Sequence, residues 1–122
     1  MPFADFVVAG STVYISGKNA RDAQTGKTIS DKTIEGQTWY ALEQIDAAMR
    51  AAGGSLKGLV KMTTFLKNWN DYRRMRDTER KYFLEHAPEL VEEPVASTVV
   101  QVTSLPREDF LIEIEAIGII AD

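Results

Sequence analysis

The final strand-like segment of the sequence places acidic residues inside an apolar pattern. Residues 110–117 alternate between two faces, as a β-strand requires. One face carries Ile112, Ile114 and Ala116, and the other carries Glu113, Glu115 and Ile117. A carboxylate within an apolar strand needs water, an ionic partner or a chemical role, because burying an isolated charge is costly. Glu113 and Glu115 are therefore the first candidates for a functional site.

A second segment rich in β-branched residues precedes this strand. It covers residues 96–102, and the polar stretch 104–109, which contains Pro106, separates it from residues 110–117. Two such runs around a polar link with a proline are typical of a β-hairpin. The sequence therefore predicts a long hairpin at the carboxyl end of the chain.

The remaining elements follow from periodicity and from residues that begin or end them. Short strands are predicted at 6–8 and 13–16, followed by a loop or a polar hairpin over 18–30. Asp31 is the expected N-cap of a helix that Gly53 and Gly54 end. A strand at 59–67 and a helix from Asn68 or Asn70 to about His86 come next, and an acidic linker over 89–93 leads to the hairpin.

These elements predict one α+β domain over residues 1–122, with two helices on one face of a mixed sheet. Several predicted strands carry apolar residues on both faces, such as Val60 and Met62 against Phe65. Two helices cover one face, so the other would expose a large apolar patch to water. Self-association is the expected remedy.

Composition excludes several kinds of chemistry. The formal net charge of −4 argues against nucleic acid as a main partner, because phosphate binding depends on cationic charge. The chain has no cysteine and one histidine, which excludes thiol chemistry and a site built from several histidines. That histidine, His86, ends a predicted helix and is expected to contact its free carbonyls. No membrane-spanning run or signal peptide is apparent, so a cytoplasmic protein is expected.

Motifs along nearly the whole chain resemble one family. In order, they are GSTVYISG from Gly10, Gln37, Leu42, AAGGSL from Ala51, VKMTTFL from Val60, Tyr82-Phe83, STVVQVTSLP from Ser97 and IEIEAI from Ile112. Together they resemble the reactive intermediate deaminase family, RidA/YjgF.

The resemblance implies a chorismate-mutase-like fold and a homotrimer whose sheets pack into a central barrel. It also implies small-molecule clefts between subunits. Family enzymes hydrolyse reactive enamines and imines, such as 2-aminoacrylate, to a keto acid and ammonia without a cofactor. No metal site is expected. The chemistry requires an arginine that binds the substrate carboxylate and a glutamate that activates water.

Carried over by position, the resemblance gives Glu113 the catalytic role; an ion pair with a lysine or arginine across a subunit interface is its alternative. On the substrate-binding side it matches Ser16, Gly17 and Val99. Phe3 stands where the family has a tyrosine, and Ser97 stands where it has the carboxylate-binding arginine. Arg76 stands where the family has an asparagine on the second helix, and an exposed ion pair with Asp77 or Glu79 is its alternative.

The loss of that arginine leaves two functions open. One is hydrolysis of enamines or imines with an altered substrate preference, weak toward 2-aminoacrylate and favouring neutral or aromatic unsaturated amines. The alternative is a trimeric binding or regulatory protein without catalysis. Ribonuclease activity, a third idea, fits poorly with the acidic charge and the single histidine.

Overall fold

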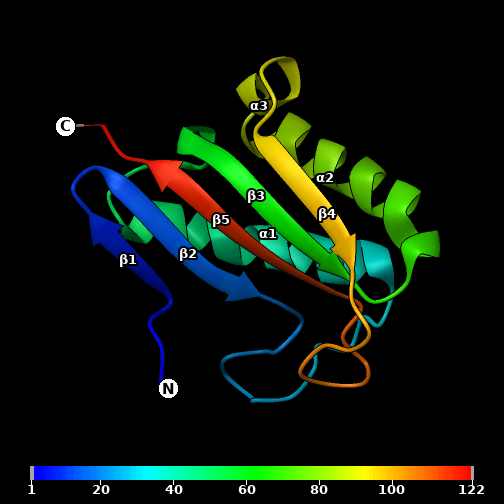
Figure 1. The fold of residues 1–122 in the computed structure, drawn as a ribbon. Coiled ribbons are helices and arrows are strands. Elements are labelled where there is room, and N and C mark those ends of the chain that lie inside the picture. The colour runs from blue at the N-terminus through cyan, green and yellow to red at the C-terminus, as the bar shows by residue number, and fades with distance from the viewer. Residues whose placement is uncertain (1, 122) are drawn as a thin grey trace.

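Five strands form one mixed sheet in the order β1-β2-β5-β3-β4, and helices cover one of its faces (Figure 1). The structure is a computed structural model and describes residues 2–121. The strands are β1 (Phe6–Ala9), β2 (Thr12–Lys18), β3 (Leu59–Leu66), β4 (Ala96–Gln101) and β5 (Ile112–Ile119). Neighbouring strands are antiparallel except β3 and β4, which run parallel. The predicted α+β fold with a mixed sheet is confirmed.

The helical layer contains two long helices, as predicted. These are α1 (Ile34–Ala51) and α2 (Tyr72–His86). Short helical turns complete it: η1 (Leu56–Gly58), η2 (Trp69–Asp71) and α3 (Glu89–Glu92). The last of these occupies the segment predicted as a linker, because Leu90 packs into the core and orders it. The N-cap of α1 is Thr33 rather than Asp31, whose carboxylate accepts hydrogen bonds from Thr33 instead.

The predicted hairpin at the carboxyl end is wrong. β3 lies between β4 and β5, so residues 96–101 pair in parallel with residues 61–66 rather than with β5. The segment after β4 carries the chain past the end of β3 before β5 begins (Figure 1). Alternation identified both strands correctly, but it does not determine which strand pairs with which.

Strand alternation also sorts residues between a buried face and an open face of the sheet. Ile112, Ile114 and Ala116 are buried against the helices. On the opposite face, Val7, Tyr14 and Ile117 lie side by side across β1, β2 and β5. Val7 and Tyr14 remain about half exposed, at 54% and 50%. The chain by itself therefore leaves an apolar open face, as the sequence predicted.

The buried side chain of Gln37 on α1 holds the segment that enters β5. Its Nε2 donates to the carbonyl oxygen of Asp109 at 2.9 Å, and its Oε1 accepts from the backbone N–H of Leu111 at 2.8 Å. Gln37 is fully buried, so these bonds form where water cannot replace them. The contact fixes where β5 starts, and with it the position of Glu113.

Replacing Gln37 with methionine keeps the side-chain length but removes both hydrogen bonds. We expect the free energy of unfolding to fall by about 1–3 kcal/mol, because buried backbone groups lose their partners. Urea denaturation followed by circular dichroism measures the change. The matched control is Gln24→Met at an exposed loop position, which should stay within about 0.5 kcal/mol of wild type. Equal losses in the two variants would contradict the role given to Gln37.

Candidate functional site

Glu113 projects from the open face near the start of β5 and is held by a side chain from the loop after β2. Asn19 Nδ2 donates to Glu113 Oε1 at 2.8 Å. Asn19 is itself anchored, because its carbonyl oxygen accepts a hydrogen bond from Gln44 Nε2 of α1 at 2.7 Å. The helical layer thus orients a carboxylate on the other side of the sheet through one intervening asparagine.

Gly17 leaves the space that the Glu113 carboxylate occupies. A Cβ atom at position 17 would lie 2.5 Å from Glu113 Oε2, which is far inside van der Waals contact. The close approach occurs where the pairing of β2 with β5 shifts register, between Ile15 and Lys18. Glycine at this position therefore has a steric reason that does not depend on any ligand.

A cavity of about 610 Å³ surrounds this carboxylate. Among its lining residues are Phe3, Ser16, Gly17 and Glu113, which the sequence predicted as site residues. Ser16 does not offer a free hydroxyl, since its Oγ donates to the carbonyl oxygen of Ala4. The other residues of the lining include Lys18, Asn19, Arg21, Arg107 and Phe110.

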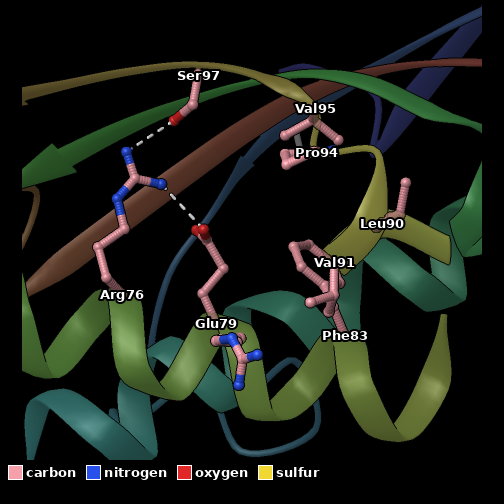
Figure 2. A pocket seen from close by; sticks show the side chains of 9 residues that line it. Arg76, Glu79, Phe83, Leu90, Val91, Pro94, Val95 and Ser97 are labelled. Atoms are coloured by element: carbon pink, nitrogen blue, oxygen red, sulfur yellow. Dashed lines mark hydrogen bonds and ion pairs between the residues drawn. The ribbon is translucent and has the colours of Figure 1, made fainter. Parts of the chain in front are cut away.

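A second cavity, of about 410 Å³, contains Arg76 and Ser97 (Figure 2). Arg76 projects from α2 and donates from Nη2 to Ser97 Oγ at 3.1 Å and from Nη1 to Glu79 Oε1 at 2.9 Å. Its Nε donates to the hydroxyl of Tyr72 at 3.1 Å. The ion pair with Glu79 was the sequence alternative for Arg76, but the side chain is only 29% exposed and lines a cavity as well.

Burial affects the two members of this ion pair differently. Burial raises the pKa of Glu79, and the charge and hydrogen bond of Arg76 only partly oppose that effect. For Arg76, burial lowers the pKa, but the hydrogen bond to Tyr72 and the Glu79 carboxylate outweigh it and the pKa is raised. Arg76 therefore stays charged, whereas burial makes the charged form of Glu79 less favourable.

The predicted site residues thus fall into two groups within the chain. Glu113 lines the cavity that also contains Phe3, Ser16 and Gly17, whereas Arg76 and Ser97 line a cavity that does not contain Glu113. Strand pairing explains the separation: Ser97 is paired with the buried Met62 and faces the helices, whereas Glu113 is paired with Phe65 on the open face. Val99, the remaining predicted residue, packs against the core beside the buried Thr64.

Other candidates contribute little to either cavity. Glu115 lies exposed on the open face. The ring of His86 stacks on Tyr82, with 4.2 Å between the ring centroids, and makes an edge-to-face contact with Trp39. Its main contacts are therefore aromatic, whereas the sequence predicted contacts with the free carbonyl groups at the end of α2. Within residues 2–121, no acidic or histidine cluster of metal-binding geometry is found. No helix in the same range is long and apolar enough to span a membrane.

Two functional candidates were missed or left ambiguous in the sequence. Asn19 stands directly after a strand, in a loop whose polar residues carry no periodic signal. Glu79 shares the buried stripe of α2 with Met75 and Tyr82, and its position on that stripe was its only signal. Both are recognised by their contacts in three dimensions rather than by a motif.

Comparisons with known proteins agree with the motif pattern. The family model described as Endoribonuclease L-PSP matches residues 1–120. A RutC family protein of Pyrococcus horikoshii is 38% identical over 117 residues, covering 96% of this chain and 86% of the relative. This chain belongs to the RidA/YjgF family. The predicted family resemblance is confirmed.

Relatives with more specific names are also similar to this chain over nearly its whole length. The 2-iminobutanoate/2-iminopropanoate deaminase of Salmonella typhimurium is 35% identical over 118 residues, covering 97% of this chain and 87% of the enzyme. The crystal structure of Escherichia coli TdcF with bound serine superposes with a TM-score of 0.86 at 32% identity, covering 99% of this chain and 90% of TdcF. Such RidA/YjgF members bind or convert small molecules on this fold.

Proposed function

We propose that this RidA/YjgF protein hydrolyses reactive enamines or imines to a carbonyl compound and ammonia. The observation that carries the proposal is the Glu113 carboxylate, which Asn19 orients over Gly17 at a cavity large enough for a small substrate. The name of the Salmonella relative, an imine deaminase, supports the same reaction class.

Glu113 has the chemistry that this reaction requires. The imine reacts as its N-protonated iminium form. In the first step the carboxylate accepts a proton from water while the water oxygen adds to the C=N carbon, and the C=N electron pair moves to the nitrogen to give a neutral carbinolamine. In the second step Glu113 returns its proton to the nitrogen of the carbinolamine. The C–N bond then breaks, ammonia leaves, and loss of the hydroxyl proton gives the carbonyl product. An enamine enters the same path once its carbon is protonated.

We further propose that the complete cleft forms between copies of a homotrimer. The apolar open face supports association, since Val7, Tyr14 and Ile117 would otherwise stay in water. The cavity of Arg76 and Ser97 lies at the edge strand β4, separate from Glu113 of the same chain. Packing of one copy against the open face of the next would bring the two kinds of cavity together.

In this proposal Ser97 occupies the place of the family's carboxylate-binding arginine, and Arg76 supplies the cation instead. The hydrogen bond between Arg76 and Ser97 supports the replacement, because it directs the guanidinium to that position. Phe3 adds an apolar surface beside Glu113 in place of a tyrosine hydroxyl. The proposed substrates are accordingly more neutral and more apolar than small amino-acid-derived imines.

The second candidate function is small-molecule binding without turnover. The ion pair of Arg76 with Glu79 favours this function, because Glu79 already occupies one donor of Arg76 and less charge is left for a substrate.

RNA cleavage is disfavoured by the position of His86, which lines a hollow with Glu43 and Asp46, away from Glu113.

The trimer is tested by mass. Light scattering of the purified protein at micromolar concentration should report about three times 13.6 kDa. Tyr14→Asp places a charge on the open face and should lower the mass toward that of one chain. Leu84→Asp is the matched control, since Leu84 is similarly exposed, at 47%, on the helical layer. A monomeric wild type would refute the proposed cleft between copies.

The catalytic role is tested by Glu113→Gln, which keeps the shape of the side chain and removes its proton transfer. Ammonia release from imines generated in situ by an amino-acid oxidase, and from a neutral aromatic imine, should fall by about 10²- to 10⁴-fold. Mass and ligand binding should not change. Glu115→Gln, two residues along the same face, should keep wild-type turnover. Wild-type rates in Glu113→Gln would favour the binding function instead.

A further inference from the structure

The cavity beside α2 combines an apolar wall with one partly buried ion pair (Figure 2). Its wall is made by side chains from α2, α3 and the segment that enters β4: Phe83, Leu90, Val91, Pro94 and Val95. Arg76 and Glu79 lie at one end of this wall and point toward each other. A ligand in this cavity would therefore bury an apolar body and meet the ion pair with its polar end.

Arg76 retains hydrogen-bonding capacity after its contacts within the chain are counted. A guanidinium has five N–H groups. Those that point to Tyr72, Glu79 and Ser97 are occupied, which leaves one N–H on each terminal nitrogen. These remaining donors can serve an acceptor atom of a ligand.

Glu79 determines which kind of ligand atom can accept hydrogen bonds from these remaining N–H groups of Arg76. Its carboxylate compensates the charge of Arg76 at 2.9 Å, so a ligand at this end of the cavity meets a pair without net charge. An entering carboxylate would also approach the negative charge of Glu79 in a poorly hydrated site, where Coulomb repulsion is strong. A neutral carbonyl or imine acceptor would gain the hydrogen bond without that repulsion.

We propose that Glu79 makes this cavity selective for uncharged ligands with an apolar or aromatic body over carboxylates of the same shape. The inference rests on the proposed function, because it identifies the substrate class that the Arg76 side of the cleft accepts. Glu79 acts through Arg76 and does not need to touch the reacting atoms. It is a positioning residue that determines specificity.

The state of Glu79 suggests a role beyond supporting the helix. The residue is 9% exposed, and among residues 2–121 its Oε2 is one of three buried side-chain oxygens without a hydrogen-bond partner. A buried carboxylate with an unpartnered oxygen costs stability, and the raised pKa of Glu79 reflects that cost. A neutral residue would avoid the cost, so the charge itself is the property to test.

Arg80 is the other charged residue of the cavity and requires its own test. It lies at the exposed side of α2, and its charge is therefore screened by solvent. Selectivity set by the Arg76–Glu79 pair should persist when Arg80 is neutralised. A cation at the rim attracts carboxylates, so Arg80 cannot itself produce a preference for uncharged ligands.

The experiment measures binding of benzamide and benzoate, which share a ring and differ in charge, by NMR titration of the intact protein. Wild type should bind benzamide about tenfold more tightly than benzoate. Glu79→Gln should reverse that order by improving benzoate affinity about 100-fold, because it frees the Arg76 charge for a carboxylate. Benzamide affinity should change by less than about threefold.

Matched variants separate this effect from others. Glu35→Gln removes the partner of Arg74 in an exposed ion pair outside the cavity and should leave both affinities unchanged. Arg80→Gln should preserve the preference for benzamide. Equal affinities in wild type, an unchanged order in Glu79→Gln, a reversal caused by Arg80→Gln, or no binding of either probe would each overturn the proposal.

Binding is read without turnover, so the outcome is independent of Glu113. If Glu113→Gln abolishes hydrolysis while the preference for benzamide is absent, the proposed function stands and the role of Glu79 falls. If the preference is found but Glu113→Gln retains activity, the cavity selects uncharged ligands in a protein that does not use Glu113 for catalysis.

Discussion

The alternation of side chains along a β-strand is the constraint on which the rest of this structure depends. It buries Ile112 and Ile114 against the helices, and it necessarily directs Glu113 to the opposite face. The same rule directs Ser97 toward α2, where Arg76 meets it. The Glu113 carboxylate therefore lies on one side of the sheet and the Arg76 guanidinium of α2 lies on the other, and a single copy of the chain does not bring them together.

Both groups are supported by the helical layer, although they differ in environment. Gln44 of α1 orients Asn19, and Asn19 orients Glu113 in a cavity that also contains cationic side chains. Arg76 is held on α2 itself by Tyr72 and Glu79. In the proposed function, the first arrangement positions a group for proton transfer, and the second fixes a hydrogen-bond donor in a largely apolar cavity. In the proposed cleft, Glu113 would carry out catalysis, and Arg76 with Glu79 would select the substrate.

The sequence predicted the elements well because each strand and helix repeats its own pattern. The pairing of residues 96–102 could not be predicted, since β3, which separates them from β5, is distant in the chain. Short-range chemistry also misplaced the N-cap, because Asp31 and Thr33 are both suitable and only their geometry decides. For the site, motifs singled out Glu113 and Ser97. Asn19 and Glu79 act through contacts that no local pattern reveals.

The central claim is that Arg76 of one copy and Glu113 of another form one site. Arg76→Gln and Glu113→Gln chains, co-expressed with different tags and purified as mixed trimers, test it most directly. Each variant alone should be inactive. The purified mixed trimers should recover about a third of wild-type turnover, because one of the three clefts in each of them pairs two intact halves. Mixed trimers as inactive as the separate variants would contradict a cleft shared between copies.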